Sequence, residues 1–280
     1  MIDLHTHSTA SDGSDSPARV AELAAGNGCG AFALTDHDGF GGLEEAGRRA
    51  AELGLRLVPG CEISCEWDPG TMHLLVYFVG PGCGELEATL GRLQEARARR
   101  NEVMIERLAE TGLPVTLEEA AAEAGGDVVG RPHVAAVLMA KGVVGSINEA
   151  FQRYLAKGRP GYVAKERLAP VVAVELARRC GGVPVIAHPL SLELEPDALE
   201  REVAGLAEAG LGGLEAHYGR YSPEERALVA DLARRHGLVA TGGSDHHGSY
   251  KPDLTVGTGR GDLVVPDEVL DELEACRRSH

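Results

Sequence analysis

The chain has 280 residues, of which 44% are hydrophobic and 25% charged, and this composition is typical of a globular protein with a full core. It carries 27 basic and 43 acidic residues, a formal net charge of −16, so long-range electrostatics disfavour binding to duplex nucleic acid. No uninterrupted apolar run reaches the roughly 18 residues that a membrane span needs, so we expect no membrane contact.

The N-terminus and the cysteines indicate the cellular compartment. Residues 1–7 read as a short strand that ends in polar groups, which leaves no room for a signal peptide. We therefore expect a cytoplasmic protein. The 6 cysteines include no Cys-x-x-Cys pair, and a chain of this length does not need disulfides to fold, so we expect free thiols.

Short apolar runs rich in Val, Ile and Leu alternate with amphipathic helical stretches along most of the chain. This alternation is typical of βα units around a parallel sheet. Helix starts are indicated at Ser16-Pro17 and Ser222-Pro223, where a capping hydroxyl precedes proline. The predicted strands are residues 2–4, 31–34, 55–58, 74–79, 183–187, 213–216 and 238–241.

The alternation stops between Pro81 and about Pro170, where helical patterns dominate. This stretch is too long to be a simple connection between the fourth and fifth strands. We predict that residues 81–169 form a helical insertion that serves as a lid or substrate domain. Residues 1–80 and 170–280 would then form the main α/β domain.

Metal-binding residue types accompany nearly every predicted strand. In a βα barrel the functional groups lie at the carboxyl ends of the strands, so these residues are expected to share one site. His5 and His7 are two positions apart and can face the same ion, and so can Asp245 and His247. The candidates are His5, His7, Asp12, His37, Glu62, His73, His188, Asp245 and His247.

This many ligands exceeds what one ion accepts, and with Glu62 as a bridge they suit two or three divalent ions. Imidazole and carboxylate ligands favour Mn, with Fe or Zn as alternatives, and the absence of cysteine argues against a closed thiolate zinc site. Such a centre can generate a metal-bridging hydroxide as the nucleophile. No side chain can be assigned as the acid that protonates the leaving group.

The motifs together resemble the PHP (polymerase and histidinol phosphatase) superfamily. The resemblance spans the whole chain and is most similar to the stand-alone phosphoesterases that act on nucleotides, including 3′,5′-nucleoside bisphosphate phosphatase. That branch carries an Arg-Pro-His motif in a helical insertion, present here as Arg131-Pro132-His133. The other matching motifs are His5-x-His7, Thr35-Asp36-His37, Glu62, His73, Ala187-His188-Pro189 and Ser244-Asp245-x-His247.

The resemblance implies a distorted (β/α)7 barrel with a small helical insertion domain between strands 4 and 5, and three metal positions. The first would be held by His5, His7, Glu62 and Asp245, the second by Glu62, His73 and His188, and the third by Asp12, His37 and His247. It further assigns Arg100, Asn101, Arg131 and His133 to substrate contact. From the residues alone, the charged stretch 97–101 favours a solvated helix face, and residues 130–133 read equally well as a helix start.

Three further residues neighbour the predicted ligands in sequence. Asp36 and Asp38 flank His37 and are candidates to orient a ligand imidazole. His246 lies between two predicted ligands and should point the other way along an extended strand, outside the site.

We expect a metal-dependent phosphoesterase that removes the 3′-phosphate of nucleoside 3′,5′-bisphosphates. The enzymatic alternatives are histidinol-phosphate phosphatase, 5′–3′ exoribonuclease on short RNA ends and AMP phosphatase. The alternative without catalysis is an interaction module that the metal ions stabilise. The expected partner is a small phosphorylated nucleotide, or a short RNA end, and neither duplex DNA nor a membrane.

Overall fold

The computed structural model describes residues 1–124, 129–164 and 166–279. Seven strands in these ranges form one sheet whose spatial order follows the sequence. All the predicted strands are confirmed, most with longer bounds. They are β1 (Ile2–Thr6), β2 (Ala31–Leu34), β3 (Arg56–Cys65), β4 (Met72–Tyr77), β5 (Val183–Ala187), β6 (Gly213–Tyr218) and β7 (Val239–Gly243).

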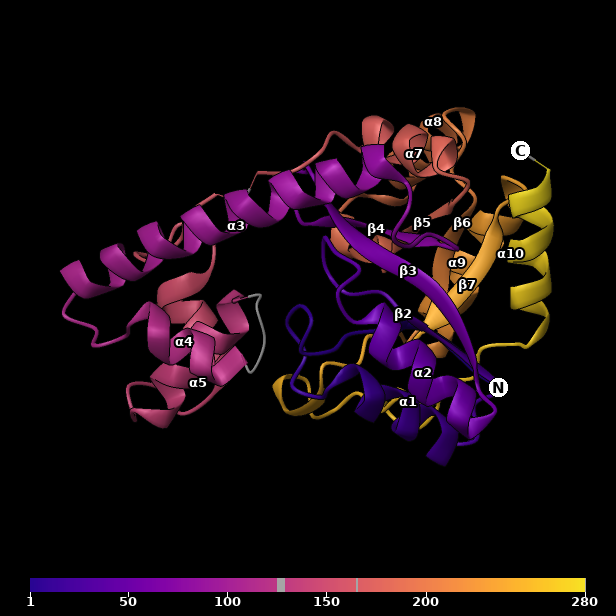
Figure 1. The fold of residues 1–280 in the computed structure, drawn as a ribbon. Helices are drawn as coiled ribbons and strands as arrows, with labels where there is room; N and C mark the ends of the chain where they lie inside the picture. The colour runs from indigo at the N-terminus through magenta and orange to yellow at the C-terminus, as the bar shows by residue number, and fades with distance from the viewer. Residues whose placement is uncertain (125–128, 165, 280) are drawn as a thin grey trace.

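The sheet curls into a nearly closed, distorted barrel because the end of β7 lies beside β1 (Figure 1). Thr6 pairs with His246 in a parallel bridge, and the Asp245 N–H donates a 2.8 Å hydrogen bond to His5 O. Gly243 allows this approach, since a Cβ at that position would lie 2.8 Å from His5 Cα. The closure therefore brings the predicted ligand His5, near the N-terminus, next to the predicted ligand Asp245, near the C-terminus.

Strand β4 runs antiparallel to both of its neighbours, β3 and β5, whereas the other paired strands run parallel. The expectation of parallel βα units throughout is wrong at this strand. Residues 66–71 are too few for a crossover helix, so the chain turns straight back from β3 into β4. The reversal places His73 opposite Ser64 on one side and opposite Ala187 on the other.

Helices cover the outside of the barrel. Both predicted helix starts are confirmed: Ser16 accepts a hydrogen bond from Arg19 N–H, and Ser222 forms a capping box with Glu225. Apolar side chains between the helices and the sheet form the main core, while residues such as Leu4 and Val185 fill a second core. The covering helices are α1 (Pro17–Gly26), α2 (Leu43–Leu53), α7 (Pro170–Arg179), α8 (Pro196–Glu208), α9 (Pro223–Arg235) and α10 (Glu268–Arg278).

Between β4 and β5, a group of helices projects from the barrel along α3 (Figure 1). It consists of α3 (Gly84–Glu110), α4 (Leu117–Ala124), α5 (Arg131–Ala140), α6 (Ile147–Ala150) and the π-helix η1 (Phe151–Leu155). These helices share an apolar core of their own that includes Met104, Leu108 and Leu138. Neither α3 nor any other helix in the described ranges has the length and apolarity to cross a membrane.

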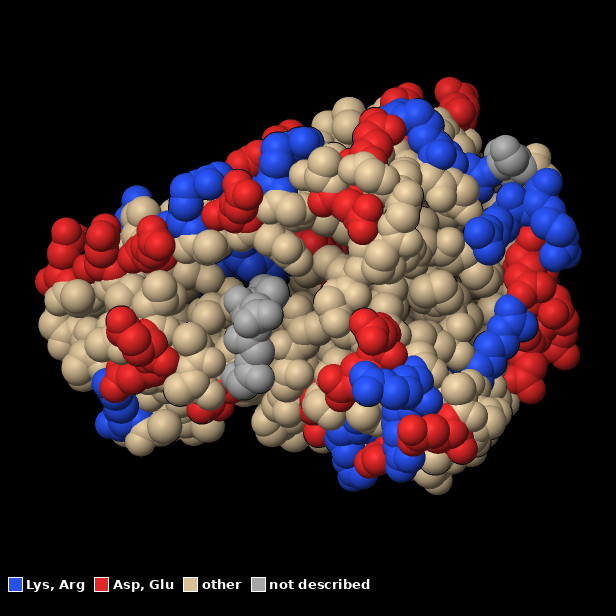
Figure 2. All heavy atoms as spheres, viewed as in Figure 1, with Lys and Arg blue, Asp and Glu red and all other residues tan. Residues whose placement is uncertain are grey.

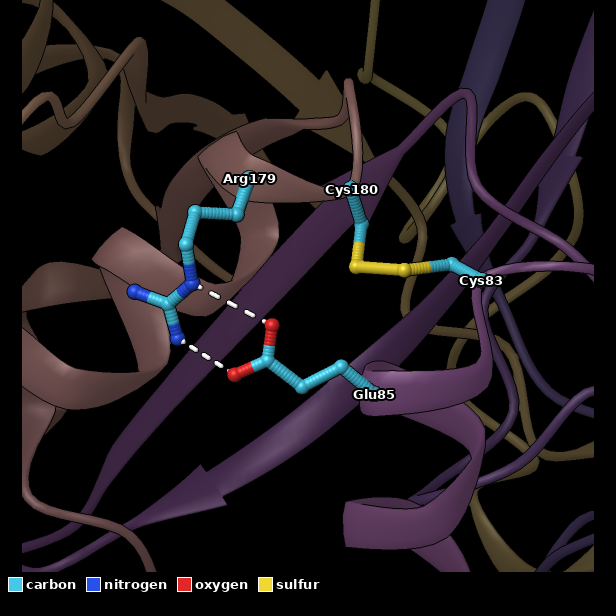
Figure 3. Close-up of a disulfide and its surroundings, with 4 residues drawn as sticks. All are labelled: Cys83, Glu85, Arg179 and Cys180. Atoms are coloured by element: carbon cyan, nitrogen blue, oxygen red, sulfur yellow. Dashed lines mark hydrogen bonds and ion pairs between the residues drawn. A yellow bond between two sulfur atoms is a disulfide. The ribbon is translucent and has the colours of Figure 1, made fainter.

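A disulfide joins the residue directly before α3 to the residue directly after α7 (Figure 3). Cys83 and Cys180 are 97 positions apart in sequence, and their Cα atoms are 5.8 Å apart. Beside them, Arg179 donates two hydrogen bonds to Glu85, at 2.8 and 3.2 Å. The expectation that all the cysteines are thiols is wrong for this pair, because the pairing of β4 with β5 and the contact of α3 with α7, and not local spacing, bring the two together.

Candidate active site

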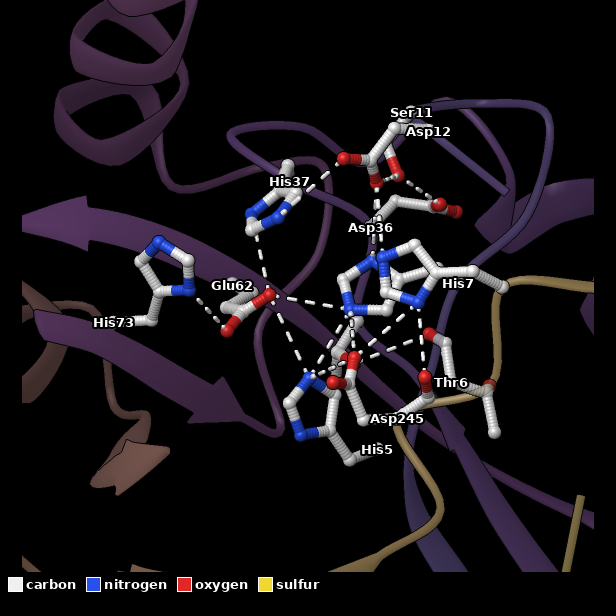
Figure 4. A network of polar contacts seen from close by, with 12 residues as sticks. His5, Thr6, His7, Ser11, Asp12, Asp36, His37, Glu62, His73 and Asp245 are labelled. Atoms are coloured by element: carbon white, nitrogen blue, oxygen red, sulfur yellow. Dashed lines mark hydrogen bonds and ion pairs between the residues drawn. The ribbon is translucent and has the colours of Figure 1, made fainter. Parts of the chain in front are cut away.

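Glu62 lies at the centre of the predicted ligand cluster (Figure 4). Its Oε2 is 3.2 Å from both His7 Nε2 and His37 Nδ1. Its Oε1 is 2.9 Å from His73 Nδ1 and 3.5 Å from His188 Nε2. One carboxylate in the middle of β3 thus faces imidazoles that come from four other segments of the chain.

The strand ends at the point of closure supply a second group of donors. His5 Nε2 is 3.1 Å from His7 Nε2, so the prediction that the two imidazoles face the same side holds. Asp245 Oδ1 is 3.6 Å from His5 Nε2 and 3.5 Å from His7 Nε2. Asp245 has a φ of 56°, a left-handed conformation that is uncommon for a residue other than glycine and turns its side chain into the cluster.

A third group forms around Asp12, which comes from the loop after β1. Asp12 Oδ1 is 3.4 Å from His247 Nε2 and 3.7 Å from His7 Nδ1, and its Oδ2 is 3.8 Å from His37 Nε2. Donors that share an ion at about 2.1 Å are expected to lie roughly 3 Å apart, or slightly more, around it. All the predicted ligands therefore meet at one end of the barrel, at distances that divalent ions can span.

The donor chemistry fits such ions. In the described part of the chain, three buried atoms form no hydrogen bond: His7 Nδ1, His37 Nδ1 and Glu62 Oε1. Each of them lies close to a ligand atom of another residue in the cluster. A bound cation would satisfy atoms of this kind. Among the described residues, three sets of ligand atoms lie within 4.8 Å of one another and could hold an ion: His7, Asp12, His37 and His247; His5, His7 and Asp245; and His37, Glu62 and His73.

The electrostatics favour the protonation state that binds metal. Burial tends to raise the pKa of Glu62, but the histidines around it, His37 first, outweigh burial and hold this pKa well below its ordinary value. The pKa of Asp245 is likewise held low, against burial, chiefly by Lys251. Burial lowers the pKa of His37, and with the charge of Lys251 it lowers that of His247 to about 4. At these four residues, ionised carboxylates thus face neutral imidazoles.

Three residues that the sequence reasoning did not select support the ligands. Glu215 on β6 accepts a hydrogen bond from His5 Nδ1. Asp245 Oδ2 accepts one from Tyr218 OH at 2.8 Å and one from Lys251 Nζ at 2.6 Å. The sequence feature that could have identified Glu215 is its charge, because it lies inside an otherwise apolar predicted strand, residues 213–216.

The residues flanking the predicted ligands form hydrogen bonds with residues outside the ligand cluster. Asp36 accepts hydrogen bonds from Ser8 and from Ser11 Oγ and so holds the loop that carries Asp12; the expectation that it orients an imidazole is wrong. Asp38 accepts a hydrogen bond from Arg97. His246 points away from the cluster, as predicted, and contacts Asp15 and Leu254.

Arginines gather in a cavity of about 260 Å³ above the ligand cluster, with His37, His73 and His247 among its lining residues. Figure 2 shows basic side chains in a hollow beneath α3, between the insertion and the barrel. Arg100 is only 8% exposed, so the prediction of a solvated helix face is wrong for this side of α3. The basic residues that line the cavity are Arg97, Arg100, Arg131, Arg167 and Lys251.

Two of the predicted substrate residues lie beside this cavity without lining it. Asn101 accepts a 2.6 Å hydrogen bond from Arg100 Nη2 and donates one of 2.7 Å to Val129 O. His133 Nδ1 accepts a hydrogen bond from the Gly130 N–H at 2.9 Å, which caps α5. Both side chains position their neighbours, whereas Arg100 and Arg131 reach the cavity themselves.

The PHP domain family matches residues 3–110. The chain is 34% identical to the 3′,5′-nucleoside bisphosphate phosphatase of Chromobacterium violaceum over 98% of this chain and 96% of that protein. It is 35% identical to the 5′-3′ exoribonuclease Rnm of Escherichia coli (strain K12) over 88% of this chain and 85% of that protein.

A solved structure from Bifidobacterium adolescentis, provisionally assigned as a metal-dependent phosphoesterase, has the same fold. It is 29% identical, covers 98% of this chain and 96% of its own, and superposes with a TM-score of 0.89. Three observations support the same family: the seven-stranded barrel, the buried cluster of histidines and carboxylates, and the sequence similarity over the full length. The chain belongs to the PHP domain family and is a metal-dependent phosphoesterase.

Proposed function

We propose that this enzyme removes the 3′-phosphate of nucleoside 3′,5′-bisphosphates. The observation that carries the proposal is the arginine-lined cavity directly beside the ligand cluster, because it offers a place for a second phosphate next to the one that reacts. The full-length similarity to a nucleoside bisphosphate phosphatase supports the same substrate class.

The metal ions would be two or three in number, with Mn as the first choice. His5, His7 and Asp245 with Glu62 would hold the first, Glu62 with His73 and His188 the second, and Asp12 with His37 and His247 the third. Bound there, divalent ions supply Lewis acidity and lower the pKa of water, so that a nucleophile can form at neutral pH.

The protein's own side chains would place the substrate. Lys251 lies where this cavity adjoins a second one of about 240 Å³, which is lined by Glu62, His188 and Tyr218, and its ammonium can neutralise a phosphoryl oxygen. Arg100 and Arg131, from the insertion, would hold the second phosphate, so the insertion would serve as the substrate domain. Histidinol phosphate suits this cavity less well, because its amino group is cationic.

A second candidate is 5′–3′ hydrolysis of short RNA. It is favoured by the 35% identity to an exoribonuclease, which is as high as the identity to the phosphatase. An RNA end also carries a second anionic group beside the reacting one, and the same cavity could hold it.

The substrate is tested by measuring phosphate and nucleotide release from Mn²⁺-loaded enzyme. The panel is adenosine 3′,5′-bisphosphate, AMP, histidinol phosphate and short 5′-phosphorylated RNA. Highest kcat/KM for the bisphosphate supports the proposal. Preference for RNA would favour the exoribonuclease, preference for AMP or for histidinol phosphate would make this a monophosphate phosphatase, and no release from any of them would favour a non-catalytic module.

The site is tested with Glu62→Gln, which keeps the shape of the central side chain and removes its charge. We expect kcat to fall on the order of a thousandfold, since metal-dependent stabilisation of the transition state amounts to several kcal/mol. Glu66→Gln, an exposed carboxylate that follows the same strand, is the matched control and should keep full activity. Equal activity of the two variants would contradict the site.

A further inference from the structure

Arg167 reaches the arginine-lined cavity from the segment that returns the chain from the insertion to the barrel. Its neighbour Leu168 pairs with Cys65 in a parallel bridge, and Leu168 O accepts a 2.7 Å hydrogen bond from the Glu66 N–H. The backbone beside Arg167 is therefore tied to the end of β3. A side chain on a backbone held in this way can define where a bound group lies.

The guanidinium groups of the cavity differ in how they are neutralised. Arg97 donates a 2.6 Å hydrogen bond to Asp38. For Arg100, Arg131 and Arg167, no carboxylate of the described residues forms an ion pair. Arg167 Nε is buried and has no hydrogen-bond partner in those ranges either. Three cationic side chains thus face one cavity without an ion pair to a carboxylate of the described residues, and Asp12 is the acidic residue that also lines it in those ranges.

This concentration of positive charge is unfavourable while the cavity holds no anion. Burial, together with the charges of Arg97, Arg131 and Arg167, lowers the pKa of Arg100 to about 9. Burial also lowers the pKa of Arg131. A phosphate would relieve the repulsion and accept hydrogen bonds from more than one guanidinium group.

We propose that Arg167 is a specificity-determining residue that, with Arg131, binds the phosphate that is not cleaved. It would distinguish substrates with two phosphates from those with one. The identity of the substrate in this inference rests on the proposed function. Of the residues that line the cavity, His37, His73 and His247 would face the phosphate that reacts, and the arginines would face the other.

The test compares Arg167→Gln with Arg167→Lys and with Arg159→Gln, an exposed arginine of the same returning segment. KM and kcat are measured with adenosine 3′,5′-bisphosphate and with AMP on the Mn²⁺-loaded enzyme. Calorimetry gives Kd of the bisphosphate for the metal-free protein, which isolates the arginine contacts from the metal contacts.

For Arg167→Gln we expect KM and Kd for the bisphosphate to rise about tenfold to a hundredfold, the usual effect of losing a charge-assisted hydrogen bond. The value of kcat and the hydrolysis of AMP should change little, because the reacting phosphate stays at the metal ions. Arg167→Lys should recover part of the affinity, and Arg159→Gln should behave as the unmodified enzyme.

Equal losses for the bisphosphate and AMP would overturn the role of Arg167, and so would an unchanged Kd in the metal-free titration. Neither result would affect the proposed function. If the unmodified enzyme does not hydrolyse the bisphosphate, the proposed function fails, and the metal-free titration decides separately on Arg167. A metal-free protein that does not bind the bisphosphate overturns the inference.

Discussion

His5 and Glu215 are joined by a 2.9 Å hydrogen bond between His5 Nδ1 and Glu215 Oε1, and both side chains are fully buried. The other carboxylate oxygen of Glu215 accepts a 2.7 Å hydrogen bond from the His188 N–H. Glu215 on β6 therefore orients the imidazole of His5 on β1 and holds the backbone at His188, which follows β5. The bond to Nδ1 leaves His5 Nε2 facing His7 and Asp245, where an ion would bind.

Glu215→Gln should weaken metal binding by about tenfold to a hundredfold, as the loss of a carboxylate behind a ligand histidine usually does. The amide can still accept one hydrogen bond, so the barrel should fold. Titration of the apoprotein with Mn²⁺ against a competing chelator measures the effect. Glu224→Gln, an exposed carboxylate at the start of α9, is the control, and affinity equal to this control would show that Glu215 does not orient His5.

Gly243→Ala should displace the His5 backbone, because the new Cβ would lie 2.8 Å from His5 Cα and closer still to His5 N and Cβ. We expect a loss of stability of about 1–3 kcal/mol from overpacking, together with weaker metal binding. Gly205→Ala on α8, where a Cβ meets no atom within 4 Å, should instead keep or slightly raise stability. Denaturant unfolding checks both, and equal stability of the two variants would contradict the closure at β1.

Metal binding should release a proton from His5. Burial by itself lowers the pKa of this imidazole, but the carboxylates Glu215, Glu62 and Asp245 outweigh burial and hold the pKa well above 6.5. The apoprotein is therefore protonated at His5 near neutral pH, and the ion must displace that proton. Affinity should rise about tenfold per pH unit until the pH passes the pKa of His5.

Calorimetry of Mn²⁺ binding in buffers of different ionisation enthalpy counts the released protons. His247, with a pKa of about 4, is neutral at pH 7 and should add none. Glu215→Gln, which removes one of the negative charges around His5, should release fewer protons. Binding without any proton release at pH 7 would contradict the assignment.

Thiol titration of the denatured, unreduced protein should find four reactive cysteines, since Cys83 and Cys180 are bonded to each other. Replacing both with serine should lower the free energy of unfolding by about 2–5 kcal/mol, because the bond restricts the unfolded chain. Cys276→Ser, which leaves the disulfide intact, is the control. Six reactive thiols in the unreduced protein would show that the bond does not form.

The strands and the ligand types could be predicted from the sequence because both are local properties. Apolar runs identify buried strands from a few neighbouring residues, as at 31–34 and 183–187, where the bounds agree with β2 and β5. Local patterns did not reveal the direction of β4, since an apolar run looks the same in a parallel and an antiparallel strand. The short connection at 66–71 was the available signal.

For the site, the sequence by itself determined which residues could bind metal, because imidazole and carboxylate chemistry belongs to the residue type. Only the tertiary structure decided that Glu215 holds His5, and that Arg100 is buried and faces a cavity instead of solvent. These are contacts between residues far apart in the chain. They depend on how the barrel closes and where the insertion folds back, which no short stretch of sequence encodes.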